Sequence, residues 1–159
     1  MWSEFASNFE LLQHLIDVFI FHHFELLDQA YNQALYLLQE REEEFFDMQN
    51  ELNPLQIAQY YNLTKEAHNK IIRAMGKSEN TLDKAFIIFE TLCEYEKGKL
   101  VDWSVCSYII IQACRVGNLA MANKALNLAK RVLDEGDILF VRREMLREVV
   151  DQPALLGTV

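Results

Sequence analysis

The feature that most constrains the fold is the segment 103–137, which has the pattern of two helices joined by a short turn. Apolar side chains recur at helical spacing in both halves, at Val105, Tyr108, Ile109 and Ala113 and then at Leu119, Ala122, Leu126, Ala129 and Leu133. Between the halves, Gly117 tolerates the left-handed backbone that ends a helix, and Asn118 offers an N-cap for the next helix. The pattern predicts a helical hairpin with its joint at residues 115–119.

A similar pattern occurs just upstream, within residues 65–102. Leu82 and Ala85 precede Leu119 and Ala122 by 37 residues each. A single hairpin cannot bury its own apolar face, so a repeat with a period in the thirties is typical of stacked helical solenoids. The sequence therefore predicts an all-α solenoid of antiparallel helical hairpins, with about seven helices.

Composition also favours an all-helical chain. The 159 residues include only five glycines and two prolines, and 51% of the residues are apolar, which is enough for the core of one domain. No run alternates with the period of two that marks a strand. The three cysteines form no CxxC pair, and no histidines stand beside them at ligand spacing. We therefore expect no disulfide, no metal site and no cofactor.

The net charge of −9 is concentrated near the start of the chain. Residues 1–62 carry eleven acidic side chains and one basic side chain, whereas residues 63–136 carry nine acidic and eleven basic side chains. Together with the helical pattern, this distribution predicts three regions. Residues 1–62 form an acidic helical region with a degenerate hairpin at 7–44, residues 63–137 form two repeats, and residues 138–159 form a capping helix with a tail.

Two local features refine this organisation. Asn53-Pro54 breaks the chain, so we expect a short helix at 55–62 and a new cap at Thr64 before the first repeat. The apolar run in residues 11–24 contains Asp17 and is too short and too polar to span a membrane. Its flanks carry acidic residues in place of the basic residues of a signal or transit peptide, so we expect no presequence in this chain.

Both repeats resemble the pentatricopeptide repeat family. That family has a short polar residue in the first helix, a basic residue before the turn, a Leu–acidic–x–Ala opening of the second helix and a closing Asp. The first repeat matches these positions at Asn69, Lys77, 82–85 and Asp102. The second matches them at Ser107, Arg115, 119–122 (without the acidic residue) and Asp137. The resemblance covers residues 65–137 and implies a right-handed solenoid. Tetratricopeptide repeats are the closest rival, but neither repeat has the proline of that family.

The resemblance implies that the chain binds single-stranded RNA, with one base read by two side chains of each repeat. Asn69 with Asp102, and Ser107 with Asp137, would be the base-reading pairs. Lys77 and Arg115 would contact phosphates, and Lys70 and Arg73 would extend the same edge. Because the family works mostly in mitochondria or plastids, the resemblance implies mitochondrial RNA processing, stability or translation within a larger assembly. A cytoplasmic location is the alternative.

The alternative function is a protein–protein interaction scaffold or a structural subunit that makes no direct contact with RNA. Short solenoids commonly bind proteins, and the acidic first third offers a surface to a basic partner. The sequence contains no glycine-rich phosphate loop, no nucleophile in a strained elbow and no carboxylates spaced across a cleft. We therefore expect no enzymatic activity, no catalytic residue and no small-molecule substrate.

Overall fold

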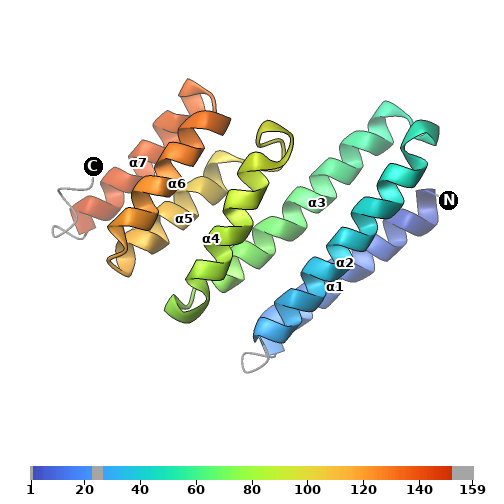
Figure 1. Ribbon diagram of the computed structural model, residues 1–159, viewed down its shortest axis with the longest axis horizontal. Coiled ribbons are helices and arrows are strands. Elements are labelled where there is room, and N and C mark those ends of the chain that lie inside the picture. Colours follow the sequence, from blue (N-terminus) through green and yellow to red (C-terminus); the bar gives the residue numbers. More distant parts are fainter. Residues whose placement is uncertain (1, 23–26, 152–159) are drawn as a thin grey trace. The chain divides into compact units, whose positions relative to one another are not determined.

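A computed structural model describes residues 2–22 and 27–151, and this part of the chain consists of helices joined by short turns (Figure 1). It contains seven α-helices and no strand, which confirms the predicted all-α class. The helices are α1 (Trp2–His22), α2 (Leu27–Met48), α3 (Pro54–Met75), α4 (Glu79–Glu94), α5 (Trp103–Arg115), α6 (Leu119–Val132) and α7 (Glu135–Asp151). Two 3-10 helices, η2 (Gln49–Glu51) and η3 (Tyr95–Lys97), follow α2 and α4. The predicted tail beyond residue 151 lies outside the described residues.

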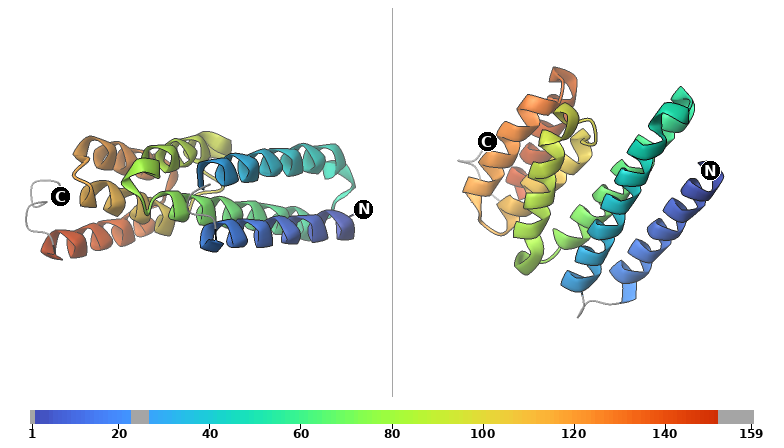
Figure 2. Two further views of the ribbon diagram at one scale, coloured as in Figure 1. Left: turned by 90° about the horizontal axis from the view of Figure 1, so that it is seen from below. Right: turned by 45° about the vertical axis from the view of Figure 1, so that its right-hand side comes forward.

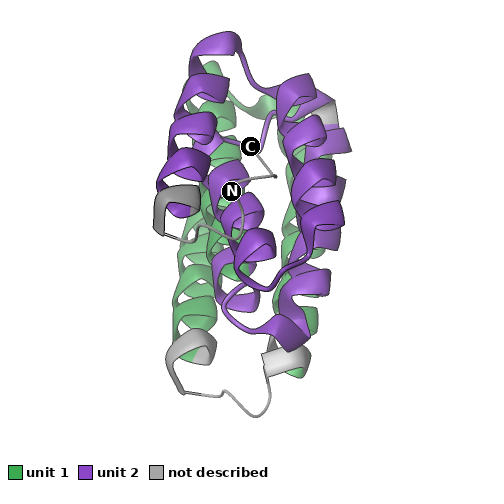
Figure 3. Cartoon of the chain, turned by 90° about the vertical axis from the view of Figure 1, so that its left-hand side faces the viewer, with its two compact units in different colours: residues 1–71 green, residues 72–159 purple. Residues whose placement is uncertain are grey.

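The chain divides into two compact units, residues 1–71 and 72–159, and the boundary falls near the end of α3 (Figure 3). The units differ in charge. The first contains twelve acidic and three basic side chains, and the second contains twelve of each. Within the described residues, no helix is both long enough and apolar enough to cross a membrane.

The core of the first unit is aromatic. In this unit α1 packs against α2. Phe45 stacks face to face on Tyr60 with ring centroids 3.7 Å apart, and Phe5 and Phe9 contact the same tyrosine ring. All four side chains are buried. Each aromatic pair of this kind adds about 0.5–1.5 kcal/mol beyond the burial of apolar area, so Tyr60 is the central anchor of the first unit.

A reciprocal cap starts α3. The side-chain oxygen of Asn53 accepts a hydrogen bond from the backbone N–H of Gln56 at 2.9 Å, and the backbone N–H of Asn53 donates to the Gln56 side chain at 3.1 Å. This is the capping-box arrangement, in which the side chain of each residue accepts a hydrogen bond from the backbone N–H of the other. Pro54 occupies the first helical position, so the helix start predicted after Asn53-Pro54 is confirmed.

The predicted end of that helix near residue 62 is wrong. α3 continues without a break to Met75, and Thr64 is a buried residue inside the helix instead of a cap. The apolar pattern explains the continuity, because buried side chains recur at helical spacing on both sides of Thr64, at Tyr60, Ala67, Ile71 and Ile72. Burial of this continuous face outweighs the local preference of Thr for a helix start.

In the second unit α5 packs against both α6 and α7, and α4 packs against α5 and α6 (Figure 2). The predicted joint between α5 and α6 is confirmed. Gly117 has a left-handed backbone with φ of 77°, and the side chain of Asn118 accepts a hydrogen bond from the backbone N–H of Met121 at 3.1 Å. Local chemistry alone therefore fixes this turn.

The predicted 37-residue register is wrong for the second helices of the two repeats. Ser78 caps α4 and Asn118 caps α6, so the N-caps lie 40 residues apart. As a consequence Leu82 is 2% exposed, whereas Leu119 at the first position of α6 is 42% exposed. The buried face of α6 comprises Met121, Ala122, Ala125, Leu128 and Ala129.

The start of α7 also differs from the prediction. The helix begins at Glu135, and Asp137 lies in its first turn instead of closing the preceding repeat. The Asp134 carboxylate accepts a hydrogen bond from the backbone N–H of Asp137 at 2.8 Å, which is the geometry of an N-cap. The chain offers two aspartates three residues apart, and the first of them caps the helix.

Candidate functional site

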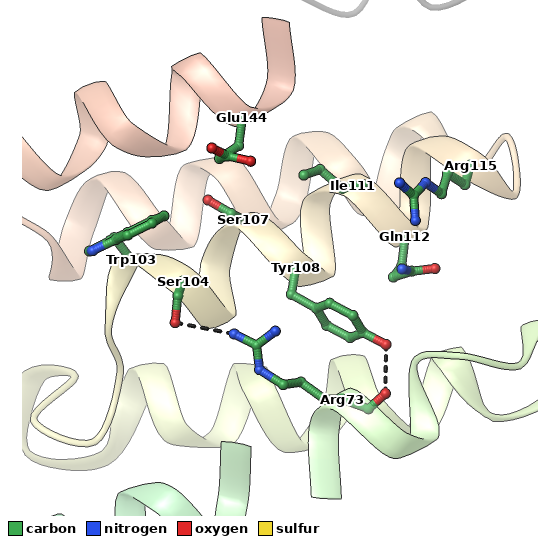
Figure 4. Close-up of a pocket in the computed structure, with 9 residues that line it drawn as sticks. All are labelled: Arg73, Trp103, Ser104, Ser107, Tyr108, Ile111, Gln112, Arg115 and Glu144. Carbon is green, nitrogen blue, oxygen red and sulfur yellow. Dashed lines mark hydrogen bonds between the residues drawn. The ribbon is translucent and has the colours of Figure 1, made fainter. Parts of the chain in front are cut away.

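A groove of about 350 Å³ runs along α5 in the second unit (Figure 4). It is bordered by the last turn of α3, by α5 and by α7. Its lining residues are Arg73, Trp103, Ser104, Ser107, Tyr108, Ile111, Gln112, Arg115 and Glu144. Those on α5 recur every three or four residues, so a single face of this helix forms most of the groove.

The N-cap of α5 orders one end of the groove. The Asp102 carboxylate accepts hydrogen bonds from the backbone N–H of Val105 at 3.0 Å and from the Ser104 hydroxyl at 2.7 Å. The Ser104 oxygen in turn accepts a hydrogen bond from the Arg73 guanidinium at 3.2 Å (Figure 4). The cap therefore holds a serine hydroxyl and, through it, an exposed cation at the groove.

Tyr108 is fixed in the middle of the groove. Its hydroxyl donates to the backbone carbonyl of Arg73 at 2.6 Å, and the Arg73 guanidinium lies 5.2 Å from the centre of the Tyr108 ring. Gly76 permits this approach, because a Cβ atom there would lie 2.6 Å from the tyrosine ring. Burial raises the pKa of Tyr108 above its ordinary value of 10, against the opposing effect of Arg73 and Arg115. The phenol therefore remains a hydrogen-bond donor.

Ser107 provides a buried hydroxyl in the lining of the groove. The residue is 4% exposed, and its oxygen has no hydrogen-bond partner among the described residues. A buried polar group left in this state costs about 1–3 kcal/mol. A ligand that fills the groove and hydrogen-bonds to this oxygen would recover that energy.

Arg115 lines the opposite end of the groove from Trp103 (Figure 4). Its guanidinium donates to both carboxylate oxygens of Glu148 on α7, at 2.8 and 3.1 Å. Glu148 is buried, with 7% exposure, while half of the Arg115 side chain is exposed. The forked pair neutralises the Glu148 carboxylate and ties α5 to α7.

An aromatic pair lies at the start of α5, where Trp103 lines the groove. Trp103 stacks on Phe140 of α7 with ring centroids 5.3 Å apart and an interplanar angle of 28°. Trp103 is half-buried, and Phe140 is 46% exposed. Planar apolar surface therefore lies beside the cation and the hydroxyl groups described above.

The structure brings together only some of the residues that the sequence singled out. Ser107 and Arg115 line the groove, and Asp102 borders it through Ser104. Lys77 is exposed in the turn after α3, and Asp137 lies in the first turn of α7, so neither lines the groove. Asn69 belongs to the first unit.

Sequence reasoning did not identify most of the lining residues, among them Trp103, Tyr108 and Gln112. Trp103 and Gln112 received no role, and Tyr108 was counted only as part of the apolar face. The useful signal was the spacing of 104, 108, 111 and 115, which places these residues on one side of the helix.

The remaining reactive groups offer no further site. Cys93, Cys106 and Cys114 are buried, and burial raises the pKa of all three thiols, that of Cys93 to about 12. These thiols are therefore poor nucleophiles. Across residues 2–22 and 27–151, no three His, Cys, Asp or Glu side chains come together as a metal site would require.

Comparisons of the chain with protein-family models, with curated proteins and with solved structures find no match.

Proposed function

We propose that this chain is a pentatricopeptide-like helical-repeat protein that binds single-stranded RNA along the α5 groove. The observation that carries the proposal is that one groove combines aromatic rings, an exposed guanidinium and a buried hydroxyl that has no hydrogen-bond partner among the described residues. In this proposal the helices form a right-handed solenoid of hairpins. The chain acts in mitochondrial RNA metabolism or translation, within a larger assembly that supplies further binding surface.

The lining of the groove suits an unpaired nucleotide. Unpaired bases stack on aromatic rings and on guanidinium planes, and each stacked base contributes about 1–3 kcal/mol. Trp103 and Tyr108 provide the rings. The Ser107 hydroxyl and the Gln112 amide provide donors and acceptors for the edge of a base.

The phosphate contacts are assigned to Arg73 and Lys77. Arg73 is exposed in the last turn of α3, and Lys77 is exposed in the turn that follows the helix. Arg115, which the sequence also placed at a phosphate, already pairs with the buried Glu148 carboxylate, so it contributes less to the attraction of a strand. Because the second unit has no net charge, we expect weak binding by the isolated chain and a strong dependence on salt.

Fluorescence anisotropy with short labelled oligouridylate and oligoadenylate strands tests the proposal. Replacing both cations, Arg73→Gln with Lys77→Gln, should weaken binding to both strands alike. It should also flatten the salt dependence by the equivalent of about two phosphate contacts. The matched control is Lys130→Gln with Arg131→Gln, which removes the same charge from the exposed end of α6. Identical titrations for wild type and the Arg73/Lys77 variant would contradict RNA binding along the α5 groove.

A second substitution separates binding from stability. Ser107→Ala removes a buried hydroxyl that has no partner in the described part of the protein, so the melting temperature should stay the same or rise. RNA affinity should nevertheless fall by about threefold to tenfold, the value of one hydrogen bond. A variant that is more stable and binds RNA as well as wild type would show that Ser107 does not face the ligand.

Protein–protein scaffolding remains the second candidate. It is favoured by apolar side chains that lie exposed in both units, including Leu11 at 59% and Leu139 at 57%. Crosslinking and affinity capture from the native compartment distinguish the two functions. Recovery of defined proteins without RNA, together with flat RNA titrations, would favour the scaffold.

A further inference from the structure

The first unit has an apolar groove between α1 and α2, and two of its leucines, Leu11 and Leu15, are exposed to solvent. Its volume is about 290 Å³, and it is lined by Asn8, Leu11, Leu12, Leu15, Leu37 and Arg41. Leu11 is 59% exposed and Leu15 is 38% exposed, and Val18 continues the same side of α1 at 46% exposure. These positions follow i, i+4, i+7 spacing, so they form one continuous stripe along the helix. We call this surface the leucine groove.

The unit that carries the leucine groove is acidic, although the one charged residue lining the groove, within the described part of the chain, is Arg41. The first unit carries twelve acidic and three basic side chains. Arg41 pairs with Glu44 at 3.3 Å, and Lys70 pairs with Asp17 at 3.1 Å. Glu4 lies one turn before Asn8 on the same side of α1 and is exposed. A helix that docks here therefore needs apolar side chains flanked by basic ones.

The chain itself carries a helix face with this chemistry. On α7, Leu139 and Leu146 are 57% and 49% exposed, and the exposed Arg142 and Arg143 lie between them. The spacing of i, i+3, i+4 and i+7 places these four residues on one side of the helix. Glu144, which lines the α5 groove, lies on the other side of α7. Phe140 lies at the edge of the face, where the Arg143 guanidinium packs 5.9 Å from the centre of its ring. We call the four residues the α7 face.

From this complementarity we propose that the protein associates with itself, with the α7 face of one copy docked in the leucine groove of a second copy. Leucines of α7 cover the α1 leucines, and Arg142 and Arg143 approach the acidic surface of the first unit. The two surfaces are different, so the contact is heterologous, and each added copy presents a free groove and a free face. The proposal does not depend on RNA binding by the α5 groove.

Sedimentation velocity over a range of concentrations, at low and at moderate salt, tests this directly. Wild type should form dimers and larger species as concentration rises, and salt should reduce the association because charges contribute to it. The groove variant, Leu11→Gln with Leu15→Gln, and the face variant, Arg142→Glu with Arg143→Glu, should each weaken association by about tenfold or more. All four side chains are exposed, so both variants should keep the helical circular dichroism of wild type.

Mixing the two variants identifies the geometry. Each variant retains one intact surface, so the groove variant and the face variant together should form a one-to-one dimer that grows no further. Lys130→Glu with Arg131→Glu makes the same charge change on the exposed end of α6 and should associate like wild type. A wild-type protein that stays monomeric throughout, association unaffected by either variant, or a mixture that yields no dimer would each overturn the proposal.

Discussion

Two glycines in the second unit have the same left-handed backbone but very different surroundings. Gly98 has φ of 82° and Gly117 has φ of 77°. A Cβ atom on Gly98 would lie 2.5 Å from the Cβ of Val132, whereas a Cβ atom on Gly117 would meet nothing within 4 Å. The pair therefore separates the cost of backbone strain from the cost of a steric clash.

We expect Gly117→Ala to cost about 1–2 kcal/mol through backbone strain alone. Gly98→Ala should cost about 1–3 kcal/mol more, because the added methyl group overpacks the contact with Val132. Urea denaturation of both variants measures the difference. Equal losses would show that Val132 moves aside without cost.

His68 should make the stability of the protein depend on pH. Its Nδ1 lies 2.7 Å from the backbone carbonyl oxygen of Thr64, and burial lowers the pKa of His68 below its ordinary value of 6.5, outweighing the opposing effect of that hydrogen bond. Below pH 6.5, His68 is therefore protonated to a greater extent in the unfolded chain than in the folded chain. The contribution of His68 is fully present above pH 6.5 and is lost as the pH falls towards the lowered value.

The measurement is the free energy of unfolding of wild type and His68→Gln from neutral to mildly acidic pH. His68→Gln should show a smaller loss of stability below pH 6.5, because the substituted side chain does not titrate. His14→Gln changes an exposed histidine of α1 in the same way and serves as the control. Parallel curves for wild type and His68→Gln would contradict this account of His68.

At the scale of single elements, Asp102 has a structural task that is separate from its predicted role at a base. Its carboxylate caps α5. Asp102→Ala should therefore cost about 0.5–2 kcal/mol, whereas Asp102→Asn should keep the cap. Thermal unfolding of the two variants checks the cap. Oligonucleotide binding by Asp102→Asn then tests base reading without a change in stability, and equal melting temperatures for Ala and Asn would argue against the cap.

The elements that the sequence predicted well are those fixed by local chemistry. Asn53-Pro54 and Gly117-Asn118 mark a helix start and a turn because each motif satisfies its own backbone groups. The continuation of α3 through Thr64 was not predictable in this way, since it depends on burial of a face that extends to both sides. The α7 start required a choice between Asp134 and Asp137, and local preference is the same for both.

The candidate site followed the same rule. Ser107 and Arg115 were singled out by their positions in the repeat, and both line the groove. The pairing of Arg115 with Glu148 joins residues 33 positions apart in the chain, so only the packing of α7 against α5 reveals it. Trp103 is held by stacking on Phe140, and Tyr108 fits against Gly76, and both of these contacts join residues that are remote in sequence.

At the scale of the whole molecule, the two units have cores of different chemistry. The first unit has a cluster of stacked aromatic rings around Tyr60 within its core, whereas aliphatic side chains and alanines such as Ile109, Ala113 and Ala125 dominate α5 and α6 of the second. α3 contributes residues to both units, so loss of either unit removes support from the same helix. We therefore expect the units to unfold in one cooperative transition.

The placement of the two tryptophans gives the protein its own optical reporters. Trp2 lies in the first unit beside Phe5, and Trp103 lies in the second against Phe140. Single-tryptophan variants, Trp2→Phe and Trp103→Phe, should show coincident melting curves by emission if the units unfold together. Because Trp103 also lines the α5 groove, a base that stacks there should change its emission. An unlabelled strand can then be titrated against Trp103 in the Trp2→Phe variant, and the Trp103→Phe variant, which retains only Trp2, is the control.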